Sequence, residues 1–230
     1  ISGSRWSMIA GGEDNTISVR SHHSFIGGGN QNILRNSSIS MIAGGYQNKI
    51  DGRFAKKGNT ILAGKGNIIE STDWGPTSGP PVSPIGGQYN TILGGWENEI
   101  SGSPEYSFIG GGRENRIRST VSGSSGGLNT STVQNSTITA GQNNEIVNTS
   151  YSGIFAGRLN IITTTDNNSA QQFNFIGAGR SNMISQSGWC TLAGGGYNTI
   201  ASNGKYSNIV GGSGSLMYRY CTYSSIVGGE

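Results

Sequence analysis

The chain contains few of the side chains that perform acid–base or nucleophilic chemistry. Its only two histidines, His22 and His23, are adjacent, so no nucleophile–base–orienting set can be proposed around them. Metal binding or a pH response is the alternative use of such a pair. The twelve Asp and Glu residues are scattered, and only Asp73, Glu97 and Glu99 are candidates to meet through folding. We therefore expect no catalytic centre, no metal site and no cofactor.

Aromatic and basic side chains recur at the two variable positions after the Gly-Gly element of the repeat, where we expect them to point outward. The residues at these positions are Tyr46, Tyr89, Trp96, Arg113, Arg158, Arg180 and Tyr197. If successive copies of the repeat stack in register, Arg158 and Arg180 lie on neighbouring coils. They can then contact an acidic glycan or another anion through bidentate hydrogen bonds. A solvated face without a ligand is the alternative.

Two segments interrupt the regular spacing and carry aromatic side chains. Residues 70–81 are rich in proline and contain Trp74, and residues 216–223 contain Tyr218 and Tyr220. Because loops on a rigid scaffold often carry binding residues, we predict ligand contacts at these side chains. The alternatives are a tolerated surface insertion for the first segment and local packing near the chain end for the second.

Cys190 and Cys221 are the only cysteines. They hold different positions in their repeats, about two copies apart, whereas the Cα atoms of a disulfide lie within about 7 Å of each other. We expect no disulfide between them.

The elements that position these residues come from an internal repeat, S-x-I-x-G-G-x-x-N-x-I. Twelve clear copies begin at Ser7, Ser24, Ser40, Asn59, Asn90, Ser107, Ser136, Ser152, Asn174, Cys190, Ser207 and Ser224. Two degenerate copies are predicted near Val82 and Ser119, which gives about 14 short coils of 16–17 residues. A unit with so few apolar residues cannot bury its own face, so neighbouring coils must stack.

Each position of the repeat has a physical reason. Ser and Ile share one face of a short strand, because side chains alternate along it. The glycine pair turns the chain, since glycine accepts positive φ. Asn tolerates left-handed backbone in the turn, and stacked amides form hydrogen-bonded ladders. The predicted ladders include Ile9, Ile26, Ile42, Ile109 and Ile154, and Asn15, Asn32, Asn48, Asn115, Asn160 and Asn198.

The composition favours the same interpretation. Gly makes up 40 of 230 residues, and charged residues are 12%, about half the usual share. We predict an all-β parallel solenoid of the β-roll or β-helix type, without helices, because the apolar period is two. It forms a single domain over residues 1–230, with loop insertions near 52–58, 70–83, 163–173 and 214–223.

The sequence also limits the partners. It has no apolar run long enough to span a membrane and no Lys/Arg run suited to nucleic acid. Two apolar anchors per coil are few for a stable interior, so we expect three chains to pool their ladders in a homotrimer.

The runs SFIGGGNQNIL, YSFIGGGRENRI and CTLAGGGYNTI are similar to repeats of bacterial and phage surface fibres. They resemble the head repeats of trimeric autotransporter adhesins over about residues 7–229. The resemblance implies a left-handed parallel β-roll with three chains, and it carries over no catalytic residue. The present coils are longer than those of the adhesins, and their spacing is less regular.

These features predict a structural or adhesive fibre domain, extracellular on a cell or virion surface. It would attach to a host-surface glycan or receptor through outward turns and inserted loops. The alternative is a carbohydrate-active β-helix, a lyase or glycosidase, which needs converging carboxylates or basic residues. An ice-binding solenoid is less favoured, because Thr follows the motif Asn at too few sites, namely Thr16, Thr91 and Thr199.

Overall fold

The structure, a computed structural model, describes residues 1–71, 88–102, 104–120, 133–164, 172–201 and 204–229. These residues form two parallel sheets and no helix. The first sheet contains β1 (Met8–Ile9), β3 (Phe25–Ile26), β5 (Met41–Ile42), β7 (Thr60–Ile61), β9 (Thr91–Ile92), β11 (Phe108–Ile109), β13 (Thr137–Ile138), β15 (Gly153–Ile154), β17 (Phe175–Ile176), β19 (Thr191–Leu192), β21 (Asn208–Ile209) and β23 (Ser225–Ile226). The second contains β2 (Thr16–Ser18), β4 (Ile33–Ser38), β6 (Lys49–Lys57), β8 (Ile68–Ser71), β10 (Glu99–Gly102), β12 (Arg116–Arg118), β14 (Glu145–Val147), β16 (Ile161–Thr163), β18 (Met183–Ser185), β20 (Thr199–Ala201) and β22 (Leu216–Tyr218).

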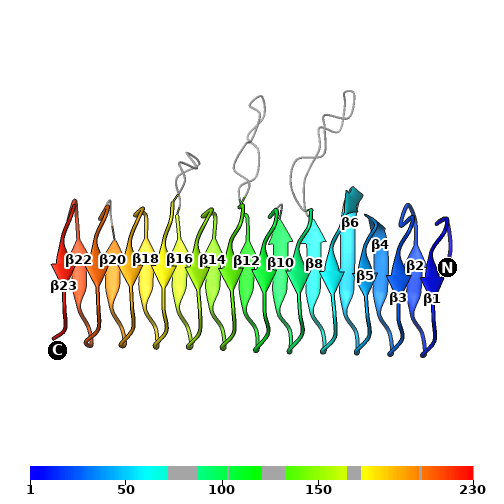
Figure 1. The fold of residues 1–230 in the computed structure, drawn as a ribbon, viewed down its shortest axis with the longest axis horizontal. Helices are drawn as coiled ribbons and strands as arrows, with labels where there is room; N and C mark the ends of the chain where they lie inside the picture. The colour runs from blue at the N-terminus through cyan, green and yellow to red at the C-terminus, as the bar shows by residue number, and fades with distance from the viewer. Residues whose placement is uncertain (72–87, 103, 121–132, 165–171, 202–203, 230) are drawn as a thin grey trace, which may run out of the picture.

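The chain alternates between the two sheets, so each coil supplies one strand to each (Figure 1). Equivalent residues lie over one another in successive rungs: Ile9 pairs with Ile26, and Ile17 pairs with Leu34. The predicted parallel β-solenoid is therefore confirmed. We call the turns between the two strands of a coil the Gly-Gly edge, and the turns that lead to the next coil the return edge.

The two apolar ladders face each other inside a single chain. Ile26, Ile42 and Ile109 have no exposed surface, Ile154 is almost fully buried, and Ile9 in the terminal rung is partly buried against the same core. Met217 extends the second ladder, although Ser215 replaces the asparagine in its coil. Since one chain buries both ladders alone, the shared core that motivated a trimer is not required.

The predicted asparagine ladder is also present. Asn115 donates from Nδ2 to the carbonyl oxygens of Gly111 and Gly141, each at 2.9 Å. Its Oδ1 accepts hydrogen bonds at 3.1 Å from both the backbone N–H and the Nδ2 of Asn144. Side-chain oxygens accept backbone N–H bonds in the same way along the stack that contains Asn15, Asn32, Asn48, Asn115, Asn160 and Asn198. The ladder satisfies turn carbonyls and amides that would otherwise be buried without partners.

The two degenerate repeats do not add rungs, which corrects the expected count of about 14. β7 pairs directly with β9, and β11 pairs directly with β13. These direct pairings leave no place in the first sheet for a strand from the copies expected near Val82 and Ser119. The twelve described first strands give a stack about 50 Å long at 4.8 Å per rung.

The predicted insertions differ in outcome. Near 52–58, β6 stays paired with β4 through a register shift, so the extra residues form a bulge within a strand. The interiors of the insertions near 70–83 and 163–173 lie outside the described residues. The prediction at 214–223 is wrong, because this described segment contains β22 in register with β20.

No helix in the described part of the chain is long and apolar enough to cross a membrane.

Candidate functional site

The Gly-Gly edge carries one outward residue per coil in a continuous column, which we call the edge column. Each column residue follows a glycine with positive φ, such as Gly112 at 90°, and pairs with the equivalent residue of the next coil. The column consists of Glu13, Asn30, Tyr46, Lys65, Trp96, Arg113, Gln142, Arg158, Arg180, Gly196 and Ser213. It therefore brings together four residues that the sequence predicted as ligand contacts: Tyr46, Trp96, Arg158 and Arg180.

Cations and aromatic rings alternate in the middle of the edge column. Lys65 Nζ lies 5.6 Å from the ring centroid of Tyr46 and 5.3 Å from that of Trp96. The Arg113 guanidinium lies 4.6 Å from the Trp96 ring. Exposed cation–π contacts of this kind contribute about 0.5–1 kcal/mol each. Lys65 and Trp96 meet because their coils are consecutive in the stack, although the two residues are far apart in sequence.

Arg158 and Arg180 are neighbours in the edge column, as predicted. Arg180 also lies 5.6 Å from the ring of Tyr197 on the next coil. Among the described residues, neither arginine has a carboxylate within ion-pair distance. Arg113, by contrast, pairs with Glu114 at 2.8 Å. The two neighbouring arginines are thus the strongest candidates for contact with an anion.

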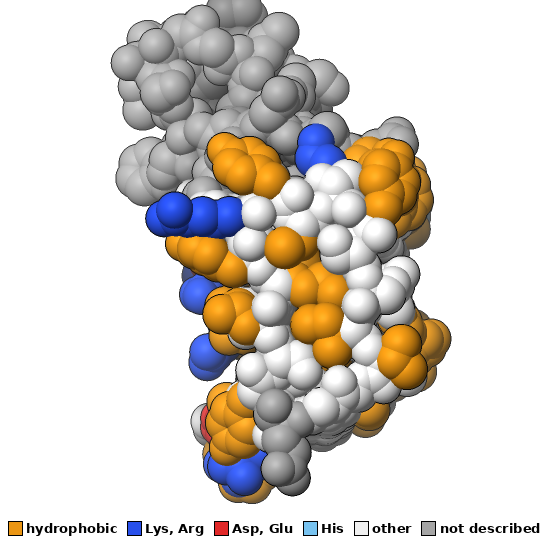
Figure 2. All heavy atoms as spheres, turned by 90° about the vertical axis from the view of Figure 1, so that its left-hand side faces the viewer, with side chains coloured by type: hydrophobic (Ala, Val, Ile, Leu, Met, Phe, Trp, Pro, Cys, Tyr) orange, Lys and Arg blue, Asp and Glu red, His pale blue; other side chains and the backbone are white. Residues whose placement is uncertain are grey.

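Four cations of the second sheet lie in ion pairs, namely Arg35, Lys49, Arg116 and Arg118. Arg35 binds Asp51 at 2.6 Å, and Arg118 binds Glu145 at 2.5 Å. The hydrogen bond and the charge of Asp51 raise the pKa of Arg35. Figure 2, viewed along the stack from the C-terminal end, shows Lys and Arg side chains gathered along one flank. The ion-paired Arg116 and Arg118 of the second sheet are a matched control for Arg158 and Arg180 of the edge column.

The residues considered for catalysis or metal binding are not brought together. The backbone N–H of Arg5 donates to His22 Nδ1 at 3.0 Å, and His23 stacks on Trp6 at 4.9 Å. Glu97 accepts a hydrogen bond from Trp96 Nε1, whereas Glu99 lies 3.6 Å from Arg116 on the second sheet. Asp73 lies outside the described residues. In the described ranges no three His, Cys, Asp or Glu side chains gather as metal ligands would.

A second column, missed by the sequence analysis, lies at the return edge. The residue before the Ser, Asn or Cys of each repeat is usually aromatic: Trp6, Tyr89, Tyr106, Tyr151, Phe173, Trp189, Tyr206 and Tyr223. Neighbours in this return column stack: Tyr206 and Tyr223 lie 5.0 Å apart and nearly parallel, at 4°. Every coil from Tyr151 to Tyr223 has an aromatic residue at this position, and each ring contacts the next. The recurring aromatic before the Ser, Asn or Cys was the signal that could have revealed it.

Most of these aromatics have left-handed backbone, for example Tyr151 at φ 53° and Trp189 at φ 58°. Left-handed geometry costs a bulky residue about 1–2 kcal/mol, and a stacked aromatic pair returns about 0.5–1.5 kcal/mol. Stacking therefore offsets much of the strain. Tyr89 belongs to this column, where it stacks on Tyr106 at 5.3 Å. Its predicted place after a glycine pair of the Gly-Gly edge is wrong, because the preceding degenerate repeat adds no rung.

The remaining predicted contacts do not join the edge column. Trp74 lies outside the described residues. Tyr218 ends β22, and Tyr220 follows it with left-handed backbone; both are more than half exposed. Arg219 lies 5.3 Å from the Tyr218 ring. These residues form a separate small cluster near the last described coil.

Both cysteines are free, as expected, but they differ in environment. Cys190 has no exposed surface, and burial raises the pKa of its thiol; Cys221 is partly exposed. Because the thiolate is the reactive form, we expect iodoacetamide to modify Cys190 at least tenfold more slowly than Cys221 near neutral pH. Peptide mass mapping of the folded protein measures both rates. Equal rates when folded would contradict the prediction, and equal rates in urea are the control.

No family model matches the chain, and no curated protein shows significant similarity to it.

Proposed function

We propose that this chain is a rigid segment of an attachment fibre on a cell or virion surface, and that its edge column binds anionic glycans. The observation that carries the proposal is the pair Arg158 and Arg180, held on adjacent rungs without carboxylate partners among the described residues. The resemblance to the repeats of bacterial and phage surface fibres supports the same role.

The scaffold suits such a role. Two full-length ladders of buried apolar side chains and one of amides hold each rung to the next, so outward residues keep a fixed spacing of about 4.8 Å. Guanidinium groups bind carboxylates and sulfates through paired hydrogen bonds. The aromatic residues of the column, Tyr46 and Trp96, offer flat faces beside the cations. A linear glycan with regularly spaced acidic groups matches this pattern.

The test measures binding of the purified chain to immobilised chondroitin sulfate, hyaluronan and neutral dextran at low and raised salt. We expect salt-sensitive binding to the two anionic polymers and none to dextran. Each arginine is expected to make one exposed charge contact of at most about 1 kcal/mol. The double variant Arg158→Gln with Arg180→Gln should therefore bind both anionic polymers about tenfold more weakly.

The matched control is Arg116→Gln with Arg118→Gln, which removes the same charge from the paired flank of the second sheet. We expect this control to retain most of the affinity. Equal losses in the two double variants would show that net charge, and not the edge column, sets binding. Binding of a single-stranded DNA oligonucleotide as tight as that of either glycan would contradict the glycan assignment.

The resemblance to fibre repeats is the only support for a homotrimer, because each chain buries its own apolar ladders. Light scattering of the purified chain measures its mass, and a stable monomer would remove the trimer from the proposal.

A further inference from the structure

The outward face of the first sheet differs in chemistry from every other surface of the solenoid. The residues directly before and after the inward-facing Ile or Leu of each first strand point outward. They are Met, Phe, Thr, Gly, Ala, Leu, Val, Asn or Ser, and never a charged residue. Figure 2 shows protruding hydrophobic side chains on the flank opposite the one along which Lys and Arg side chains gather. This face offers no charged side chain to an ionic ligand at these positions, so it favours an uncharged one.

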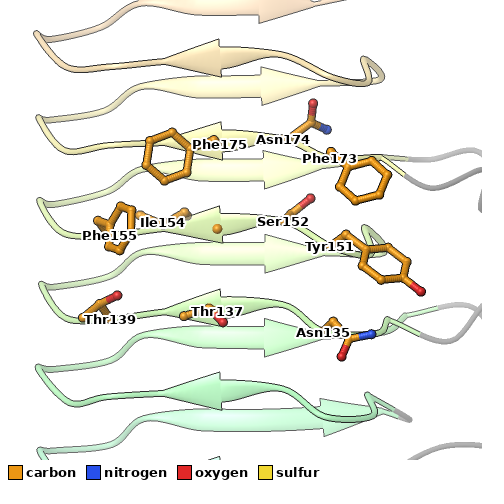
Figure 3. A pocket seen from close by; sticks show the side chains of 11 residues that line it. Asn135, Thr137, Thr139, Tyr151, Ser152, Ile154, Phe155, Phe173, Asn174 and Phe175 are labelled. Carbon is orange, nitrogen blue, oxygen red and sulfur yellow. The ribbon is translucent and has the colours of Figure 1, made fainter.

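One glycine opens a hollow in this face. Thr137, Gly153 and Phe175 are neighbours in the outward positions of three successive rungs. The missing side chain of Gly153 leaves an open depression of about 380 Å³ (Figure 3). A Cβ at Gly153 would lie 3.6 Å from the Phe175 ring and 3.9 Å from the Thr137 carbonyl oxygen, both ordinary contacts. The backbone there has no positive φ, so it does not require glycine.

Aromatic rings stand at both ends of the hollow. At the return edge, Tyr151 and Phe173 stack with centroids 5.1 Å apart. Toward the Gly-Gly edge, Phe155 and Phe175 meet edge-to-face at 5.0 Å. Three residues lie between Tyr151 and Phe155, so four steps of extended chain separate their Cα atoms by at most about 13 Å. Figure 3 shows the two ring pairs toward opposite ends of the strand that carries Ile154.

Polar groups complete the lining. Asn135, Thr137 and Thr139 line the depression beside the ring pairs. Among the described residues, the side chains of these three have no hydrogen-bond partner, so they are available to a ligand. A purely apolar ligand would leave them unused, whereas a sugar offers an apolar ring face and several hydroxyl groups.

We propose that the Gly153 hollow binds uncharged pyranose units of an oligosaccharide, with sugar faces stacked on the ring pairs and hydroxyls bonded to Asn135, Thr137 or Thr139. Concave sites that combine aromatic walls with a few polar groups are the usual form of small-ligand sites. This site is separate from the edge column and does not depend on the anionic-glycan proposal.

The test titrates the full chain with cellotetraose, maltotetraose and mannotetraose and measures binding by calorimetry and ligand-observed NMR. Gly153→Thr fills the hollow with the residue found at Thr60, Thr91, Thr137 and Thr191 in the same column. We expect at least one sugar to bind, and Gly153→Thr to weaken it at least tenfold while leaving the melting temperature unchanged or higher. That combination separates loss of the site from loss of the fold.

Two controls define the site further. Asn208→Thr makes a similar change in the same column three rungs away and should not alter sugar binding. Tyr151→Leu removes a ring beside the hollow and should weaken binding, whereas Tyr106→Leu removes a stacked ring at a rung without a hollow and should not. The absence of saturable binding to every sugar, or binding that survives Gly153→Thr, overturns the proposal. Arg158→Gln with Arg180→Gln should leave neutral-sugar binding intact.

Discussion

Gly112→Ala is expected to lower the free energy of unfolding by about 3 kcal/mol or more. The backbone at Gly112 has φ 90°, a region that costs a non-glycine residue about 1–3 kcal/mol. An added Cβ would also overlap the carbonyl oxygen of Gly141 and lie 2.7 Å from Asn115 Nδ2. Neither group can withdraw without breaking the ladder. Thermal unfolding followed by circular dichroism should show a midpoint about 10 °C lower.

The adjacent glycine provides the matched control. A Cβ on Gly111 would have no atom within 4 Å, and its backbone is not left-handed. Gly111→Ala should therefore melt within a few degrees of the natural chain. If the two variants melted alike, the Gly-Gly turn would tolerate a side chain at either position, and the close stacking of Gly112 on Gly141 would be refuted.

Asn115→Ala is expected to cost about 3 kcal/mol or more. Asn115 has no exposed surface, and its loss leaves the backbone N–H of Asn144 and the Gly111 carbonyl without their side-chain partner. Each buried polar group left unpaired costs about 1–3 kcal/mol. Urea denaturation measures the change as a lower midpoint.

The same substitution in the terminal rung serves as the control. Asn15 makes equivalent bonds, to the carbonyl oxygens of Gly11 at 3.0 Å and Gly29 at 2.9 Å, but these lie in contact with solvent. Water can replace the lost amide there, so Asn15→Ala should cost less than half as much. Equal costs at the two positions would mean that burial does not set the strength of the ladder.

The sequence was sufficient to predict what lies inside each coil. The alternation of Ser and Ile decides which side chains face inward, because a strand turns successive residues to opposite faces. The glycine pair and the following Asn likewise fix the turn. Ile26, Ile42, Asn32 and Asn48 accordingly occupy the ladder positions predicted for them.

The pairing of coils across insertions was not predictable in the same way. Degenerate motifs near Val82 and Ser119 resemble further rungs, yet the chain passes them and pairs Ile61 with Ile92 and Ile109 with Ile138. A local pattern shows that a segment can form a strand. Whether it enters the stack depends on the neighbours that it would bury, which lie far away in sequence.

The sequence by itself determined the rung: its inward isoleucines, its glycine turn and its amide ladder, because each repeat carries the same residue types and stacks on the equivalent positions of its neighbour. Only the tertiary structure decided which outward side chains meet. It placed Lys65 between Tyr46 and Trp96 and opened the hollow at Gly153, neither of which was predicted from the sequence. The physical reason is that outward positions do not constrain folding, so their neighbours follow from how complete coils stack.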